Sequence, residues 1–362
     1  MTTPGCTAEA SGVTVGELLV AIDENYRAGA ARLWPIIDAA RSIILPFHVN
    51  SDPDAVGSTL GAYHLLTALG KEVTVYASDG DFPRIVDFLP AAERIMRYGG
   101  GALPDCDLIL GLDSSDTARL GALYTENAER FAAGPTIMID HHVTNVHFGV
   151  APGGIDANFI DSTAAATAEI VYLLARAWGL PIDAAAATCL LAGIYGDTLG
   201  LQTTSTAPRV VRVVADLLTA GADLTALVNN FYRSRPFATV RIWGATLDRA
   251  EWSGKVVWSQ ITPEMLAAAG ASESGSGGVI NFLAGTAGAH AVVLLNRGAG
   301  EWRAGLRTLV EAVDVATIAE QFGGGGHRKA AGCRIAGDEA ERDAFLREVD
   351  RLAAAQIAAA NG

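Results

Sequence analysis

Residues 47–58 read FHVNSDPDAVGS and separate two segments of different periodicity. The apolar, β-branched run at 42–45 predicts a buried strand before them. Apolar residues at helical spacing after Asp54 predict a helix on the other side. His48, Asp52 and Asp54 should therefore lie between the carboxyl end of a strand and the amino end of a helix. In open α/β sheets, ligands bind at such a position.

The residue types in this loop favour a metal site. Pro53 fixes its own φ angle and stiffens the loop, so that Asp52 and Asp54 can point to one place. Two neighbouring carboxylates repel each other unless a cation lies between them, and a nearby imidazole suits manganese or zinc. The alternative is an ordinary helix N-cap, a common role for a single aspartate.

Three further segments read as strands, at 72–76, 107–112 and 136–139. The second leads into Asp113 and the third into the triplet at 140–142, Asp-His-His. Strands that alternate with helices predict an α/β fold built on a doubly wound parallel sheet. Because parallel strands point the same way, we expect these polar ends to meet at one edge of the sheet.

Helical spacing predicts helices at 13–40, with an interruption near Pro35, and at 164–178, 183–195 and 315–322. The helix at 183–195 is almost wholly apolar, which indicates burial. Near the carboxyl end, Phe345, Leu346, Val349 and Leu352 form a helical stripe that we attribute to packing.

Composition narrows the class of protein. The 362 residues are 50% hydrophobic and carry a net charge of −14, so a broad basic surface for long nucleic acids is not expected. The 4 cysteines are scattered without a CxxC pair, which is typical of reduced thiols in a cytoplasmic protein. We expect neither a signal peptide nor a membrane span.

An aspartate follows the buried helix at 183–195, and it would be costly there without a partner. With the strand ends it completes a set of four carboxylates and two imidazoles: His48, Asp52, Asp54, Asp113, His141 and Asp197. Two divalent ions would neutralise this set, and paired ions are a standard device for phosphoryl displacement. Asp113, on a central strand, is the expected bridge. Taken singly, Asp113 and Asp197 could be caps, and the two histidines a surface pair.

The chain is expected to divide into a disordered amino terminus at 1–12, a catalytic domain at 13–215, a linker region of helices at 216–240 and a substrate-binding domain at 241–362. The pattern break at 233–236 marks the junction. In the last domain we expect strands at 256–261, 291–296 and 302–307, and a Ser/Gly loop at 272–278.

A glycine run at 323–326 precedes His327 and a small-residue segment at 330–332, which we expect to begin a further helix. Exposed N–H groups of the run, together with His327, would make an anion site, although such a run can also be a simple hinge. Arg307 could bind phosphate through two hydrogen bonds, or lie on a solvated strand edge.

Together these residues resemble the DHH phosphoesterase family, and within it the group of nanoRNases and pAp phosphatases. The resemblance rests on the motifs at 48–58, 113–116, 140–142, 193–198 and 323–332. It implies a catalytic DHH domain and a smaller α/β DHH-associated domain, with the active site in the cleft between them.

The resemblance also implies residue roles. One Mn²⁺ would be held by His48, Asp52 and Asp113, and a second by Asp54, Asp113, His141 and Asp197, with Mg²⁺ or Co²⁺ as substitutes. His142 would face the scissile phosphate with support from Asp140, so that His142, Asp113 and Asp140 form the catalytic set. The substrate's far end would be bound by Arg307, Gly324, Gly325, Gly326 and His327.

The activity expected from the resemblance is hydrolysis of short oligonucleotides to mononucleotides, of pAp to AMP and phosphate, or of both. Hydrolysis of cyclic di-AMP or pApA, a single-strand exonuclease and an inactive nucleotide sensor stay open as alternatives. An inorganic pyrophosphatase is disfavoured because it should lack the glycine run. The expected partners are short oligonucleotides or small nucleotides, with no long nucleic acid and no membrane, and a homodimer is left open.

Overall fold

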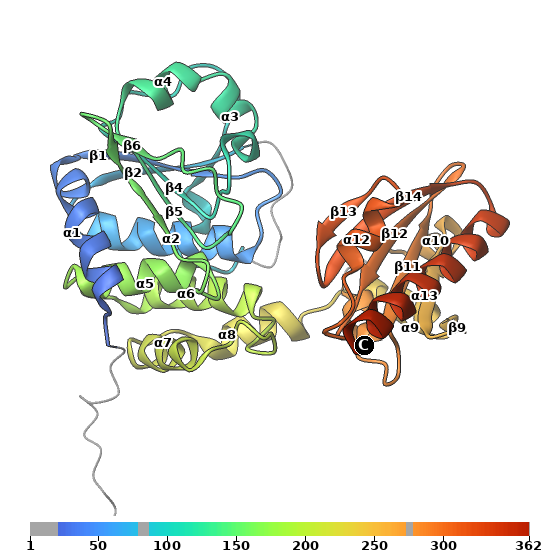
Figure 1. Ribbon diagram of the computed structural model, residues 1–362. Helices are drawn as coiled ribbons and strands as arrows, with labels where there is room; N and C mark the ends of the chain where they lie inside the picture. Colours follow the sequence, from blue (N-terminus) through green and yellow to red (C-terminus); the bar gives the residue numbers. More distant parts are fainter. Residues whose placement is uncertain (1–20, 79–86, 273–277, 362) are drawn as a thin grey trace, which may run out of the picture. The chain divides into compact units, whose positions relative to one another are not determined.

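The computed structural model describes residues 21–78, 87–272 and 278–361. The chain forms two compact units, which meet in sequence at Arg233 and Ser234 (Figure 1). The expected disordered segment at 1–12 and most of the Ser/Gly loop at 272–278 lie outside the described residues. Leu217 and Leu227, from the expected linker region, pack in the core of the first unit.

The first unit is built on a sheet whose main strands are parallel. Its order is β3-β2-β1-β4-β5-β6-β7, and β8 pairs with β5. Only the short pairs β5–β6 and β6–β7 are antiparallel in this part of the structure. The strands are β1 Ser42–Phe47, β2 Glu72–Ala77, β3 Ile95–Arg97, β4 Leu108–Leu112, β5 Thr136–Asp140, β6 Val150–Ala151, β7 Ile155–Asp156 and β8 Asn158–Ile160.

This strand order confirms the doubly wound sheet and locates its switch point. The chain runs outward from β1 to β2 and β3, and then returns to place β4 on the other side of β1. At such a reversal the loops after the two central strands diverge, which leaves room for a ligand. The loops concerned are those that follow Phe47 and Leu112.

Helices cover both faces of this sheet (Figure 1). One face carries the larger core, and the other carries a smaller cluster around Leu120, Leu123 and Phe131. The helices are α1 Glu24–Ala39, α2 Pro53–Ala68, α3 Ala122–Thr125, α4 Ala128–Ala133, α5 Thr167–Ala177, α6 Ala184–Asp197, α7 Pro208–Thr219 and α8 Leu224–Val228, with 3₁₀ turns η3 Ala92–Arg94 and η4 Thr117–Leu120 and the π turn η5 Asn229–Arg233.

Two details differ from or extend the sequence analysis. Helix α1 continues through Pro35 instead of breaking there, because packing of Leu33 and Ile37 in the core supports it on both sides.

Helices α2 and α6 lie very close because both carry glycine at the crossing. A Cβ at Gly57 would come within 2.5 Å of the backbone at Cys189, and one at Gly193 within 2.6 Å of Asp54 Oδ1.

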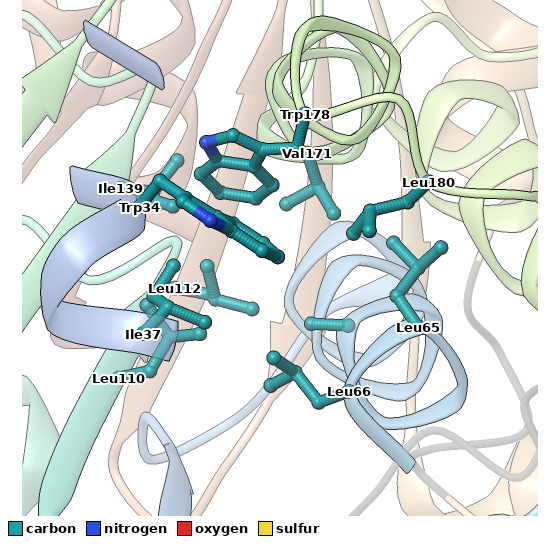
Figure 2. A pocket seen from close by; sticks show the side chains of 11 residues that line it. Trp34, Ile37, Leu65, Leu66, Leu110, Leu112, Ile139, Val171, Trp178 and Leu180 are labelled. Carbon is teal, nitrogen blue, oxygen red and sulfur yellow. The ribbon is translucent and has the colours of Figure 1, made fainter. Parts of the chain in front are cut away.

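A small cavity of about 20 Å³ lies in the apolar core beneath the sheet, between the side chains of Trp34, Leu66, Leu112 and Trp178 (Figure 2). Apolar side chains line it throughout, and such a space stays dry. It is far too small for a nucleotide, so we treat it as a packing gap.

The second unit contains a mixed sheet in the order β13-β14-β12-β11-β10-β9, in which only β10 and β11 are paired in parallel among the described strands. Its strands are β9 Glu251–Ser253, β10 Val256–Ile261, β11 Ala291–Arg297, β12 Glu301–Arg307, β13 Gly325–His327 and β14 Ala330–Ala336. Its helices are α9 Phe237–Leu247, α10 Pro263–Ala269, α11 Val279–Ala284, α12 Val315–Glu320 and α13 Glu339–Asn361.

The carboxyl-terminal stripe packs as expected, since Phe345, Leu346 and Val349 of α13 are buried in the core of this unit. The expected helix after the glycine run is wrong. Residues from Ala330 form strand β14, because alternate residues such as Ala331 and Cys333 face the core. No helix of the described residues is both long enough and apolar enough to cross a membrane.

Candidate metal centre

The loop after β1 brings its polar side chains toward the sheet. His48 is only 2% exposed, and its Nδ1 lies 2.8 Å from the carbonyl oxygen of Val49. Asp52 caps α2, since its Oδ1 accepts hydrogen bonds from the N–H groups of Asp54 and Ala55, both at 3.0 Å. The N-cap alternative therefore holds for Asp52, and it uses one of the two carboxylate oxygens.

Asp54 is fully buried, and its carboxylate accepts hydrogen bonds from the first N–H groups of another helix, α5. Its Oδ2 accepts from the N–H of Thr167 at 2.6 Å and its Oδ1 from that of Ala168 at 3.0 Å. These N–H groups begin α5, whose own N-cap residue, Ala166, has no capping side chain. Burial, followed by the charge of Asp52, raises the pKa of Asp54 to about 7. A metal ion would reverse this shift by favouring the charged form.

Asp113 follows β4 in a left-handed backbone conformation, with φ of 57°. A residue other than glycine adopts this region at some cost, and such strain is often found at functional sites. Its Oδ1 accepts a hydrogen bond from the hydroxyl of Thr167 at 2.9 Å. Its Oδ2 is buried and has no hydrogen-bond partner in the described structure. Burial, with the charges of Asp54 and Asp52, raises the pKa of Asp113 well above its ordinary value.

The triplet after β5 is held by Asp140, which is buried. Its Oδ1 accepts from the N–H groups of His141 and His142 and lies 2.8 Å from His142 Nδ1, while its Oδ2 accepts from Asn145 at 2.6 Å. Burial alone would raise the pKa of Asp140, but these hydrogen bonds from His142 and Asn145 hold it below its ordinary value. Asp140 thus stays ionised and orients His142.

His141 points into the group of carboxylates. Its Nε2 lies 3.2 Å from Asp197 Oδ2, 3.6 Å from Asp113 Oδ1 and 3.9 Å from Asp54 Oδ2. Like Asp113 Oδ2, this nitrogen is buried without a hydrogen-bond partner among the described residues. Burial and the neighbouring His142 lower the pKa of His141, so the ring is neutral, as a metal ligand must be.

The six residues selected from the sequence thus come together at one edge of the sheet. We call them the acidic cluster: His48, Asp52, Asp54, Asp113, His141 and Asp197. Potential ligand atoms gather in three groups, each within 4.8 Å: His48, Asp52 and Asp113; Asp54, His141 and Asp197; and Asp113 with Asp140, His141 and His142. Asp113 belongs to two of these groups.

The cluster fits divalent metal ions on its own chemistry. Two buried atoms, Asp113 Oδ2 and His141 Nε2, have lone pairs that no described donor satisfies. Burial also raises the pKa of Asp197 well above its ordinary value, with the charges of Asp54 and Asp52 adding to the effect. Raised pKa values of neighbouring buried carboxylates mean that too little positive charge lies nearby to stabilise their ionised forms. A divalent cation would supply that charge, and mixed carboxylate and imidazole ligands suit ions such as Mn²⁺.

Sequence patterns missed two contacts in this region. Thr167 binds both Asp54 and Asp113, through its N–H and its hydroxyl. Arg119, on η4, places its Nη2 atom 3.1 Å from His48 Nε2. Threonine is common at the start of a helix and arginine is common in loops, so neither residue could be selected as a site residue from the sequence alone. The only hint for Arg119 is that it follows the Asp113 strand end closely.

The residues expected to bind the substrate's far end lie in the second unit. Arg307 is half-buried on β12 and donates to Asn281 Oδ1 at 3.2 Å and to the carbonyl of Leu306 at 2.9 Å. Burial lowers its pKa. Among the residues that the structure describes, no carboxylate forms an ion pair with it. It is therefore a cation suited to an anionic ligand.

The glycine run includes an edge strand. Gly325 and Gly326 belong to β13, which pairs with β14 on one side only. A Cβ at Gly324 would lie within 2.1 Å of the Gly332 carbonyl oxygen, so the chain requires glycine there. His327 is opposite Ala330, which is also the partner of Arg307 in the next pair of strands. The side chain of His327 lies outside the described part of the structure.

Two family models match this chain, one within each of its two units. The DHH family, N-terminal domain, matches residues 42–194, and the DHHA1 domain matches residues 254–355. The first match contains the whole acidic cluster except Asp197, and the second contains Arg307 and the glycine run.

Two similar curated proteins share one name, which states two activities. The bifunctional oligoribonuclease and PAP phosphatase NrnA of Thermus thermophilus is 34% identical over 301 residues, which is 82% of this chain and 84% of the relative. The protein of the same name from Bacillus subtilis is 25% identical, over 83% of this chain and 92% of the relative.

Two solved structures have the same fold. An exopolyphosphatase-related protein from Bacteroides fragilis matches with a TM-score of 0.81 at 22% identity, covering 91% of this chain and 98% of that chain. RecJ of Thermus thermophilus in complex with Mn²⁺ matches with a TM-score of 0.52 at 18% identity, covering 93% of this chain but 56% of its own. From the matched domains and the extent of the Thermus NrnA likeness, the chain belongs to the DHH family, with a DHHA1 domain after the DHH domain.

Proposed function

We propose that the chain is a metal-dependent phosphoesterase that hydrolyses short oligoribonucleotides to mononucleotides and pAp to AMP and phosphate. The observation that carries the proposal is the acidic cluster, in which buried Asp113 Oδ2 and His141 Nε2 have lone pairs without a donor. The choice of substrate comes from the relatives named oligoribonuclease and PAP phosphatase.

Two ions would be held by the acidic cluster, and Mn²⁺ suits its mixture of ligands. The proposed sets are His48, Asp52 and Asp113 for one ion, and Asp54, His141 and Asp197 for the other. We add Asp113 to the second set because its Oδ1 lies 3.6 Å from His141 Nε2. When bound, such ions stabilise the charge that develops on a phosphate and activate water for attack. Asp113, as the proposed shared residue, would belong to both sites.

His142 is the residue of this chain that we propose to face the reacting phosphate. Its Nδ1 donates to Asp140 at 2.8 Å, which leaves Nε2 to exchange a proton with the reaction. Its side chain is 23% exposed, unlike that of buried Asp140. Asp140 acts through His142 by fixing the ring and its tautomer.

In the second unit, we propose that Arg307 binds a phosphate at the far end of the substrate. A half-buried guanidinium without a carboxylate partner among the described residues favours such an anion. Edge strand β13 has one side that pairs with no other strand of the described residues, and His327 is its last residue.

A substrate series tests the proposal. The purified protein with Mn²⁺ should hydrolyse diribonucleotides and pAp, and kcat/KM per end should fall as the strand grows from a dinucleotide to a twenty-mer. The reason is the net charge of −14, which repels every phosphate that no specific cation binds. Moderate salt should narrow the gap by screening this repulsion.

The outcomes separate the alternatives. A preference for the twenty-mer would place the protein with the exonucleases. Activity on cyclic dinucleotides alone would assign it to that narrower class. Failure to hydrolyse any member of the series, while metal ions are bound, would overturn the proposal and favour a nucleotide sensor.

A further inference from the structure

Thr167, the first residue of α5, lies between two of the residues proposed to hold metal ions. Its side chain is fully buried, and its N–H and its hydroxyl donate to different carboxylates. The N–H donates to Asp54 Oδ2 at 2.6 Å, and the hydroxyl donates to Asp113 Oδ1 at 2.9 Å. Thr167 thus joins a carboxylate of α2 to the one that follows β4.

The two oxygens of Asp113 face different parts of the acidic cluster. Oδ1 lies 3.6 Å from His141 Nε2, and Oδ2 lies 3.7 Å from His48 Nε2. His141 and His48 belong to different proposed ion sets. A carboxylate placed in this way can supply one oxygen to each ion, so its rotation decides whether it bridges them.

The fold fixes the backbone of Asp113 but not the rotation of its carboxylate. The N–H of Asp113 donates to the carbonyl oxygen of Ile139 at 3.1 Å, which ties the residue to β5. The last torsion of an aspartate side chain is soft and has broad preferences. Oδ2 has no hydrogen-bond partner among the described residues, and the Thr167 hydroxyl is the one described donor to Oδ1. The orientation of the carboxylate therefore depends on Thr167.

Threonine is suited to hold this carboxylate for two reasons. Its branched side chain has restricted χ1 rotamers, so the hydroxyl is already in place before an ion binds. A carboxylate oxygen offers two lone pairs, so Asp113 Oδ1 can accept from the hydroxyl and still bind an ion. The start of α5 is itself anchored, because the N–H of Ala168 donates to Asp54 Oδ1 at 3.0 Å.

We propose that Thr167 is a positioning residue for the metal pair: its hydroxyl holds the Asp113 carboxylate in the rotation that turns one oxygen toward each proposed ion set. This inference rests on the proposed function, because it needs two ions in the acidic cluster. Thr167 acts through Asp113. Loss of its hydroxyl should weaken the binding of both ions and disturb the carboxylate that they share.

A role in folding alone predicts something different. If the hydroxyl only satisfied a buried carboxylate, its loss would lower the melting temperature of the metal-free protein and leave ion binding by the folded protein unchanged. The positioning role predicts weaker ion binding and a changed magnetic coupling between the ions in a protein that is still folded. Thr167→Val separates the two roles, because valine keeps the branched shape and the N–H but has no hydroxyl.

The experiment is a calorimetric titration of Mn²⁺ into chelator-stripped wild type, Thr167→Val and Thr167→Ser, with Thr246→Val as the control. Thr246 is a fully buried threonine of the second unit, and its hydroxyl donates to the carbonyl oxygen of Ile242 at 2.7 Å. Thr167→Val should bind the ions about ten- to a hundredfold more weakly, as expected for loss of a group that orients a metal ligand. Thr167→Ser keeps the hydroxyl but not the branch, so it should stay within about threefold of wild type. The control should match wild type.

The second measurement is electron paramagnetic resonance of the Mn²⁺-loaded proteins. Two Mn²⁺ ions that share a carboxylate are magnetically coupled, whereas isolated ions give single-ion signals. Wild type, Thr167→Ser and Thr246→Val should show the coupled signal. Thr167→Val, loaded at a concentration of Mn²⁺ that saturates its weaker sites, should show mainly single-ion signals.

The outcomes separate this inference from the proposed function. Wild type that binds no divalent ion overturns both together. Wild type that binds ions, with undiminished affinity in Thr167→Val or equally weak binding in Thr167→Ser or the control, overturns the inference alone. Weaker binding with an unchanged coupled signal, or no coupled signal in wild type, overturns the orientation of Asp113. Thermal melting in chelator identifies an unfolded variant, and if Thr167→Val does not fold, Thr167→Ala is judged by the same criteria.

Discussion

Two groups of buried acidic residues lie in the first unit, and they differ in whether the chain itself supplies a positive charge to their carboxylates. The first is the acidic cluster. The second is an ion-pair network in which Arg209 donates to Glu169 Oε1 at 2.6 Å and to Asp161 Oδ2 at 3.1 Å, with Tyr26 donating to the same Asp161 oxygen at 2.6 Å. The other Glu169 oxygen accepts from the N–H of Ala165 at 2.7 Å.

In the network, each acid has its counter-charge within the chain. Although burial alone would raise it, hydrogen bonds from Thr163 and Tyr26 and the charge of Arg209 hold the pKa of Asp161 below its ordinary value. In the acidic cluster, burial raises the pKa values of Asp54, Asp113 and Asp197. The difference indicates that the network is complete as folded, whereas the cluster needs positive charge from outside.

The two groups are also connected. The segment at 161–166, which the network fixes, presents the carbonyl of Ala164 at 3.4 Å from His141 Nδ1. Helix α5 begins directly after it, with Thr167 bound to Asp54 and Asp113. The ion-pair network thus supports the acidic cluster, in which Asp113 Oδ2 and His141 Nε2 have no hydrogen-bond partner among the described residues.

The largest expected effect is on the free energy of unfolding, which should change in opposite directions when an acid of the ion-pair network and an acid of the acidic cluster are neutralised. In excess chelator, Glu169→Gln should lower the free energy of unfolding by about 2 to 3 kcal/mol, because it removes the closer of the two carboxylates that pair with Arg209 and leaves only Asp161. Asp113→Asn should instead raise it by about 1 kcal/mol, since it removes a buried carboxylate without a partner for one oxygen. Urea unfolding followed by circular dichroism measures both.

The same Asp113→Asn protein, with Mn²⁺ restored, should lose at least about a hundredfold in phosphoesterase activity. Asp52→Asn should lose less activity than Asp113→Asn because Asp52 belongs to only one proposed ion site, and its change in stability should be small because asparagine also caps helices. If Asp113→Asn destabilises the metal-free protein as much as Glu169→Gln does, the contrast between the two groups is wrong.

A smaller effect is expected from pH. The pKa of Asp54 is raised by burial to about 7, against about 4 in an unfolded chain, so the folded metal-free protein holds more protons between these values. Its stability should therefore fall by about 2 kcal/mol as the pH rises from 5 to 7. The network contributes no such slope there, because the lowered pKa of Asp161 makes its contribution disappear only as the pH falls below about 4. Saturating Mn²⁺ should remove the slope, and a slope that persists with the metal would have to originate elsewhere.

The sequence predicted the part of this arrangement that follows from local pattern. The apolar runs before His48, Asp113 and His141 marked strands, and the parallel direction of those strands placed their ends together. Asp197 could be added because an acid after an apolar helix requires a partner.

The remaining features depend on contacts between distant segments. Pro35 is accommodated because tertiary packing outweighs its local cost. Strand β14 begins with small residues at Ala330 that suit a helix equally well, and its pairing with β12 decides the outcome. Arg119 meets His48 only because β4 lies next to β1 in the sheet.

The central claim is that the acidic cluster is completed by metal ions, and a metal count tests it most directly. The protein would be stripped with chelator, equilibrated with Mn²⁺, freed of excess ion and measured by elemental analysis beside Asp113→Asn and Glu169→Gln. The account predicts two ions per wild-type chain, at most one in Asp113→Asn, and two in folded Glu169→Gln. A wild-type chain that retains no ion, or a full count of two in Asp113→Asn, would contradict it.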